Sequence, residues 1–264
     1  MTVSYGKAAV TVYRTDGQRT LFGAELQLEV LDDGVLPAYT TGDNSLVVPT
    51  DTMKNFIHTT ALDYPGTSLE ELLDLVGRKF LSTYRHFSTI RLRAREVPFA
   101  RQSAALFRRL YDDYGIAEMT LTRTGIGEYR SGREALHLVK LTGSSFAQFY
   151  RDAYTTLPEM ADRPLLVHLN VYWRAQEFLD YVDGAVVREV LCETFDAFVS
   201  KSIQHLVYEM GQRLLARFPR LLDVSFEAEN HLWDTAQTLQ ADPRVKVYTE
   251  PRPPYGVIGY TVKR

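Results

Sequence analysis

The sequence predicts an α+β protein in which one module of antiparallel strands and layered helices occurs twice. Strands with regular apolar and polar alternation indicate sheets with one wet face. In each half of the chain a helical stretch is followed at once by such a strand, at 87–95 and at 222–228. Because 264 residues exceed the usual size of one domain, we expect a first module at 1–133 and a second at 134–264.

The composition is that of an ordinary soluble globular protein and argues against several partner classes. Hydrophobic residues make up 45%, charged residues 24%, and the net charge is −3. The basic residues form no single tract, so we expect neither nucleic acid nor an anionic membrane as a partner. No apolar run of a signal peptide or membrane span is found, and the last residues do not form Ser-Lys-Leu. We therefore expect a cytoplasmic location.

The first elements are a hairpin and a capped helix. Strands at 8–13 and 20–31 flank the turn residues Asp16-Gly17, and apolar residues alternate with Glu and Gln in the second strand. After Pro65-Gly66, Thr67 or Ser68 can cap a helix. Its apolar face is predicted to consist of Leu69, Leu72, Leu73, Val76 and Phe80.

A strand with three arginines on one face follows this helix. Arg91, Arg93 and Arg95 alternate with small and apolar residues. Such a row resembles a DNA-binding stripe, but no aromatic residues interleave with it. We therefore interpret it as a solvated or subunit-facing sheet surface.

The second half repeats the order of the first. Strands are predicted near 119–123, 135–141, 165–173, 222–228 and 257–262, with one long helix at about 186–217. The predicted core stripe of that helix consists of Phe195, Phe198, Val199, Ile203, Leu206 and Met210.

Local motifs for metals and common cofactors are absent. The six histidines, at 58, 86, 137, 168, 205 and 231, show no H-E-x-x-H spacing and no close His/Cys pair. Neither a dinucleotide fingerprint, a P-loop nor a nucleophile elbow occurs. We therefore expect no metal and no cofactor.

Several polar segments follow one another from Tyr5 to Gly256. They are Tyr5-Gly6-Lys7, the stretch Asp43 to Asn55, Tyr84-Arg85-His86, Ser145-Phe146, Arg151 to Leu157, Asp162-Arg163, Ser202-Ile203-Gln204 and Asn230. In type and order they resemble the urate oxidase family, and the stretch at 43–55 is specific by itself. The resemblance covers essentially the whole chain.

The resemblance implies a fold, a reaction and an assembly. The fold would be two tandem tunnelling-fold (T-fold) modules, antiparallel sheets with helices layered on one side, that join between subunits into barrels around a tunnel. The reaction would be cofactor-independent oxidation of urate by O₂ to 5-hydroxyisourate and hydrogen peroxide. We expect a homo-oligomer, a homotetramer, whose sheet edges are closed by partner subunits.

The resemblance also implies which residues hold the substrate. Arg163 would clamp urate through two parallel hydrogen bonds, and Phe146 would stack on its ring. The side chain of Gln204 and the backbone N–H of Ile203 would contact the opposite edge of the purine. Thr50 and the backbone N–H of Asp51 would contact the five-membered ring from a neighbouring subunit.

The candidate base is Lys7, with the Thr50 hydroxyl relaying the proton. By resemblance Lys7 is expected in the same chain as Phe146 and Arg163. The family often adds a histidine two residues after the asparagine, but here Asn230 is followed by His231 and Leu232. Either His231 is displaced into the relay or water completes it, and we favour water, with Asn230 as a polar contact near the oxygen position.

Two other functions remain open at this point. One is another T-fold purine or pterin enzyme, although such enzymes usually bind zinc through histidines. The other is a purine-binding protein with a degraded relay, which Leu232 makes conceivable.

Overall fold

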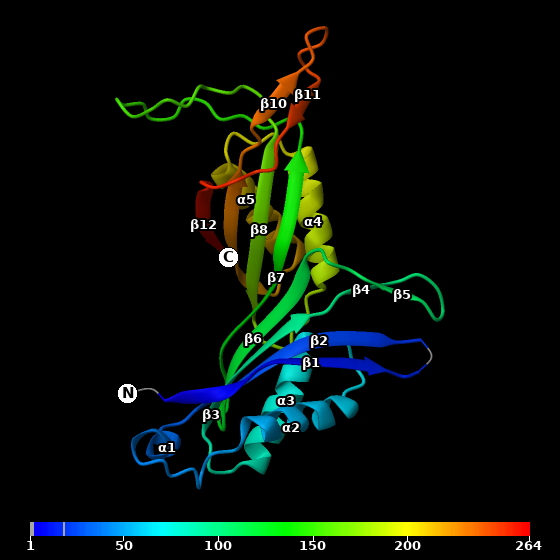
Figure 1. The fold of residues 1–264 in the computed structure, drawn as a ribbon, viewed down its shortest axis with the longest axis vertical. Helices are drawn as coiled ribbons and strands as arrows, with labels where there is room; N and C mark the ends of the chain where they lie inside the picture. Colours follow the sequence, from blue (N-terminus) through cyan, green and yellow to red (C-terminus); the bar gives the residue numbers. More distant parts are fainter. Residues whose placement is uncertain (1–2, 18) are drawn as a thin grey trace. The chain divides into compact units, whose positions relative to one another are not determined.

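The computed structural model describes residues 3–17 and 19–264. The chain divides into two compact units. Unit 1 comprises Met1–Gly132 and Arg174–Tyr181, and unit 2 comprises Arg133–Trp173 and Val182–Arg264. Apart from short elements, each unit has the chain order strand, strand, helix, helix, strand, strand, so the α+β duplication is confirmed. Figure 1 shows the arrangement of the elements within each unit. The domain bounds 1–133 and 134–264 stay a proposal.

Unit 1 is a sheet in the order β1-β2-β3-β6 with helices packed on one face. Its strands are β1 (Ser4–Thr15), β2 (Leu21–Leu31), β3 (Thr89–Glu96) and β6 (Tyr114–Thr122). Its helices are α2 (Thr50–Leu62) and α3 (Leu69–Thr83), preceded by the short η1 (Asp33–Val35) and α1 (Leu36–Thr40). A small hairpin, β4 (Phe99–Arg101) and β5 (Phe107–Arg109), leaves the sheet.

The predicted patterns of unit 1 are confirmed in detail. On β2, Leu26 and Leu28 are buried and Leu28 pairs with Leu92 of β3. The hydroxyl of Ser68 accepts a hydrogen bond from the Glu71 N–H at 3.3 Å and caps α3. All five predicted core residues of α3 are buried against the sheet. The helix forms here because the capping residue directly precedes the first residue of the apolar stripe.

The arginine row of β3 lies on the opposite, polar face of this sheet. Arg91 pairs with Glu29 at 3.3 Å and Arg93 with Glu118 at 3.0 Å, both across neighbouring strands. Alternation therefore places cations opposite carboxylates, which is the arrangement of a structural sheet surface.

Unit 2 has the sheet order β7-β8-β9-β12. Its strands are β7 (Gly125–Lys140), which enters from unit 1, β8 (Leu165–Ala175), β9 (Leu221–His231) and β12 (Gly256–Lys263). Its helices are α4 (Gly184–Ala197) and α5 (Ile203–Arg217), and β10 (Thr235–Thr238) pairs with β11 (Lys246–Tyr248). Buried apolar residues of β9 and β12 lie under α5, which contacts both strands.

The single helix predicted at 186–217 is wrong, because the chain breaks it into α4 and α5. The break lies at 198–202, where Val199 is 67% exposed rather than in the core, and Phe198 is only partly buried. The Ser202 hydroxyl then accepts from the His205 N–H at 3.1 Å and starts a new helix. The other four residues of the predicted stripe are buried. The break creates a second helix N-terminus.

None of the helices described at residues 3–17 and 19–264 has both the length and the apolar composition required to cross a membrane.

Candidate active site

Three chain segments of unit 2 are joined by backbone hydrogen bonds around Phe146 and Arg163. The Arg163 N–H donates to the Ser144 carbonyl at 2.8 Å, and the Ser145 N–H donates to the Ser200 carbonyl at 2.9 Å. Phe146 exchanges two such bonds with Met160, at 2.8 and 2.9 Å. Residues separated by up to 55 positions in sequence are thus held at one place, beside the break that precedes α5.

The carboxylate of Asp162 supports this junction. It accepts hydrogen bonds from the Thr142 hydroxyl and from the Gly143 N–H, the latter at 2.7 Å. The Thr142 hydrogen bond, followed by those from backbone N–H groups, outweighs desolvation and lowers the pKa of Asp162. Asp162 is therefore a positioning residue next to Arg163.

Arg163 is a half-buried cation whose Nε has no hydrogen-bond partner among the described residues. Burial lowers the pKa of its guanidinium. The guanidinium carbon lies 5.5 Å from the ring centroid of Phe146, and the Phe146 ring stacks with Phe149 at 5.0 Å. A desolvated guanidinium with an unpaired donor beside an aromatic ring suits a flat anion.

Ile203 and Gln204 are the first two residues of α5. The first N–H groups of a helix have no acceptor within it, and the Ser202 side chain occupies only the N–H of His205. The Ile203 side chain is buried and fixes the helix start, whereas the Gln204 side chain is exposed. This end of α5 therefore presents N–H donors and a positive helix dipole to a ligand.

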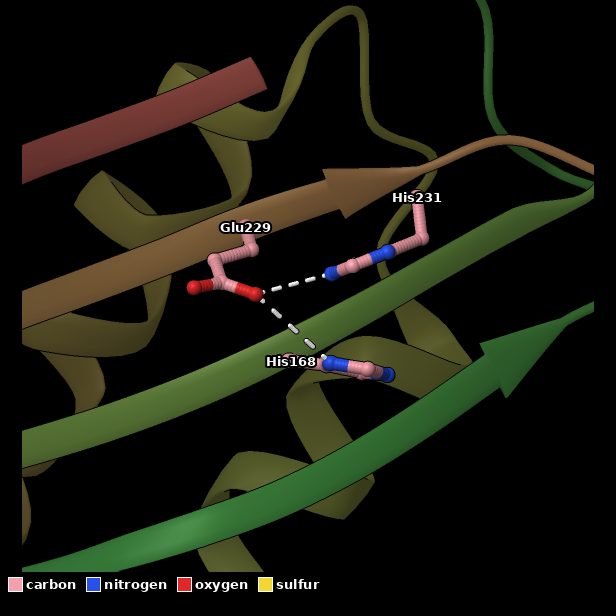
Figure 2. Close-up of side chains that lie close together, drawn as sticks. All are labelled: His168, Glu229 and His231. Atoms are coloured by element: carbon pink, nitrogen blue, oxygen red, sulfur yellow. Dashed lines mark hydrogen bonds and ion pairs between the residues drawn. The ribbon is translucent and has the colours of Figure 1, made fainter. Parts of the chain in front are cut away.

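Asn230 and His231 point to opposite faces of β9. Asn230 shares its face with the buried Phe226 and Ala228, and its Oδ1 is buried with no hydrogen-bond partner among the described residues. His231 instead binds Glu229 at 2.8 Å, and their Nε2 and Oε2 atoms lie on the other face, as Figure 2 shows. The structure therefore does not place His231 beside Asn230, and a displaced histidine relay gains no support.

The segment Tyr5-Gly6-Lys7 lies near the start of β1, which fixes its conformation. The Tyr5 hydroxyl accepts from the Val48 N–H at 2.9 Å and so ties β1 to the segment before α2. A Cβ at Gly6 would lie 2.0 Å from the Leu28 carbonyl oxygen, so only glycine fits. The register shifts between Lys7 and Val10, a bulge that reorients the side chains there.

Thr50 and Asp51 are the first two residues of α2, directly after Pro49. Both are exposed, and no side chain of residues 3–17 or 19–264 caps this helix. The pKa of Asp51 is lowered first by Lys54, which binds it at 2.5 Å, and also by the charge of Lys7. The charge of Lys7 is the last of these causes. Because α2 contacts β1 in unit 1, Lys7 can be grouped with Thr50 and Asp51 in one half-site.

One side-chain group was missed by the sequence-based reasoning. His168, Glu229 and His231 have ligand atoms within 4.8 Å of one another. The spacing rules used on the sequence detect ligands on one helix, whereas these residues come from the adjacent strands β8 and β9 (Figure 2). Burial, followed by repulsion from His137 and His231, lowers the pKa of His168.

Comparison with known proteins places the chain in a family. The family model described as Uricase matches residues 3–109 and 129–259. The chain is 39% identical to the uric acid degradation bifunctional protein PucL of Bacillus subtilis and 35% identical to a uricase of Haloferax volcanii, matching 100% and 99% of this chain. These matches cover 61% and 98% of those two relatives. For the first two curated relatives, the chain spans about three fifths of their length, 61% and 59%.

Solved structures agree in sequence and in fold. The urate oxidase of Bacillus sp. TB-90 superposes with a TM-score of 0.93 at 38% identity, over 99% of both chains. A uricase from Bacillus fastidious superposes with a TM-score of 0.92 at 35% identity, over 100% of this chain and 94% of that one. The predicted tandem T-fold is thereby confirmed. Because the family model matches residues 3–109 and 129–259 and the solved structures superpose over 99% or more of this chain, the chain belongs to the uricase family.

Proposed function

We propose that this chain oxidises urate with O₂ and water to 5-hydroxyisourate and hydrogen peroxide. Urate loses two electrons and gains a hydroxyl group from water, while O₂ takes up the two electrons and two protons. The observation that carries the proposal is the half-buried Arg163, with its unpaired Nε, beside the ring of Phe146. Urate is a flat anion, and these two groups match its charge and its shape.

The unit 2 residues would bind and orient the ring. Arg163 would donate two parallel hydrogen bonds to a urate oxygen and ring nitrogen, and Phe146 would stack on the ring. The Gln204 amide and the Ile203 N–H would meet the opposite edge, where the N-terminus of α5 adds a positive dipole. Asn230, whose Oδ1 is buried without a partner among the described residues, would contact the oxygen or water position.

The unit 1 residues would handle the proton. A neutral Lys7 amine would accept it through the Thr50 hydroxyl, and the Asp51 N–H at the start of α2 would hold the five-membered ring. Since the electrons come from urate, the protein has only to orient the reactants and stabilise charge. The absence of a metal or cofactor requirement stays a prediction of this mechanism.

The active site would be shared between subunits of a homo-oligomer, with a tetramer as the predicted state. The family resemblance implies that Lys7 and Arg163 of one active site come from the same subunit. The contact between α2 and β1 in unit 1, together with the effect of the Lys7 charge on Asp51, supports a different division. One subunit would supply Lys7, Thr50 and Asp51, and its neighbour Phe146, Arg163, Ile203, Gln204 and Asn230. The cytoplasmic location also stays a prediction.

Loss of the ultraviolet absorbance of urate, with one peroxide formed per urate, tests the proposed reaction. We expect turnover by the purified chain after exhaustive chelation, and unchanged turnover after zinc or copper is added back in trace amounts. Binding of urate without loss of absorbance would mean a purine-binding protein. Turnover that returns only with a metal or flavin would contradict the cofactor-free mechanism.

A further inference from the structure

We propose that His168, Glu229 and His231 form a binding site for a divalent cation of the late first transition row, with Zn²⁺ as the best match. His168 lies on β8, and Glu229 and His231 lie on the adjacent strand β9. Figure 2 shows nitrogen atoms of both imidazoles directed toward the same carboxylate oxygen of Glu229. Two imidazoles and one carboxylate are a common donor set for such metals.

The distances between the ligand atoms fit one metal ion. His231 Nε2 lies 2.8 Å and His168 Nδ1 lies 3.7 Å from Glu229 Oε2, and all three ligand atoms lie within 4.8 Å of one another. Ligands that each bind zinc at about 2.0–2.1 Å in a tetrahedral arrangement are about 3.4 Å apart. The first two separations bracket this value. Because the planes of the His168 and His231 rings differ by only 32°, one ring has to rotate before both nitrogen lone pairs point at the same ion.

Strand alternation fixes which side of the sheet carries the group. On β8, Val167 and Leu169 point into the core while His168 points the other way. On β9, Ala228 is buried in the core while Glu229 and His231 point the other way. Asn230, a proposed substrate contact, is on the core side. The cation site is therefore separate from the urate site and does not rest on the proposed reaction.

Neighbouring rings hold the two imidazoles in place. His137 of β7 stacks on His168 with ring centroids 3.8 Å apart, and Tyr255 lies 4.6 Å from His231. His168 and His231 themselves are 4.0 Å apart. The stack therefore keeps the two imidazoles close together, and a rotation of one ring would turn its nitrogen toward an ion beside Glu229.

Solvent access and the ligand preferences of metal ions limit which ion can bind at this site. The side chain of His231 is 9% exposed, whereas those of His168 and Glu229 are 32% and 38% exposed, so solvent reaches the ligands from one side. A water can then complete four-coordination. Mg²⁺ and Ca²⁺ prefer oxygen donors and are expected to bind poorly to two imidazoles. A bound ion would join β8 to β9 and thus stabilise the unit 2 sheet.

Equilibrium dialysis of the chelator-treated, intact oligomer against Zn²⁺ tests this proposal. We expect one Zn²⁺ per chain, no comparable uptake of Mg²⁺, and a rise in the unfolding temperature with zinc. Co²⁺ in place of zinc should give a visible absorption spectrum with nitrogen ligation. Glu229→Gln keeps the shape but removes the anionic ligand, so the zinc affinity should fall at least tenfold.

The matched controls lie on the same face of the sheet. Glu227→Gln changes a carboxylate two residues away on β9, and His137→Gln removes an imidazole that stacks but does not ligate. Both should retain zinc within about threefold of the unchanged protein. If Glu229→Gln unfolds, His168→Gln serves instead, with circular dichroism as the check on folding. No stoichiometric zinc in the unchanged protein, or equal zinc affinity of Glu229→Gln and Glu227→Gln, would overturn the proposal.

Discussion

The starts of α2 in unit 1 and α5 in unit 2 have the same design but different surroundings. Each helix begins with a residue pair that we propose contacts the substrate, Thr50-Asp51 in one and Ile203-Gln204 in the other. The start of α5 is capped by Ser202 and stands beside the bonded segments that hold Arg163. The start of α2 is exposed and has no side-chain cap within the part of the chain that the structure describes. The comparison indicates a preformed binding half in unit 2 and an open half in unit 1.

The largest effect should come from the open half. Lys7→Met removes the proposed base, so kcat should fall by about 10²- to 10⁴-fold while the affinity for a urate analogue changes little. Steady-state kinetics and calorimetric titration measure the two quantities. Lys54→Met is the matched control, since it removes a lysine that binds Asp51 but has no proposed role in the proton relay. Equal loss of turnover in both variants would contradict the role of Lys7.

The next effect should come from the preformed half. Arg163→Ala removes a charge-assisted contact of about 1.5–3 kcal/mol, so urate should bind roughly 10- to 100-fold more weakly. Arg163→Lys should restore only part of this affinity, because lysine cannot donate the parallel pair. Arg151→Ala, which changes an exposed arginine bonded to the Leu157 carbonyl, serves as the control. Unchanged urate affinity in Arg163→Ala would remove the clamp from the mechanism.

A smaller effect should come from Asp162, which supports the preformed half. The hydrogen bond from the Thr142 hydroxyl is the first cause that lowers the pKa of Asp162 in the folded state. The carboxylate therefore stabilises the fold above the unfolded-state pKa, which is near 4. This stabilisation is lost as the pH falls through the folded-state pKa. Asp162→Asn should be less stable at pH 6 by at most about 1 kcal/mol, because the carboxylate is exposed and solvent-screened. Thermal unfolding from pH 6 to pH 3 should show this difference shrinking. A difference that grows toward acid pH would contradict the assigned cause.

The smallest effect is expected at the arginine row, which belongs to neither half. Arg91 pairs with Glu29 on the sheet surface, with the Arg91 side chain 58% exposed. Arg91→Ala should change the free energy of unfolding by less than about 1 kcal/mol and leave kcat and KM unchanged. Denaturant titration and urate kinetics measure both. A strong loss of assembly or turnover would show that this face is a subunit contact rather than a solvated surface.

Local patterns predicted those elements whose causes are local. The β1–β2 hairpin and α3 were predicted because a turn, a cap and an apolar stripe lie within a few residues of one another. The break before α5 was missed because Phe198 and Val199 continue the apolar stripe. That segment is held by Ser145 and Gly143, which bond to Ser200 from far away in sequence. The spacing of apolar residues in the sequence does not reveal such a long-range hydrogen bond.

The candidate site was predicted from family resemblance rather than from physical patterns. In isolation Arg163 is a loop arginine beside a proline, and only the fold shows that it is half-buried with an unpaired Nε. The bulge at Lys7 likewise depends on pairing with β2. His168 and His231 are brought together by neighbouring strands, which no short spacing reveals.

Pairwise mixing of impaired variants tests most directly the claim that two different halves complete one active site. Three pairs are co-expressed with distinct tags. The mixed, folded oligomers are assayed at a urate concentration far below the KM of Arg163→Ala, so that sites lacking Arg163 contribute little turnover. Arg163→Ala with Lys7→Met, and Arg163→Ala with Thr50→Val, should each recover about a quarter of the sites after random assembly. Lys7→Met with Thr50→Val should recover none, because both lesions lie in the same half. Recovery only in the pairs that contain Thr50→Val would return Lys7 to the half of Arg163, and no recovery in any pair would contradict a shared site.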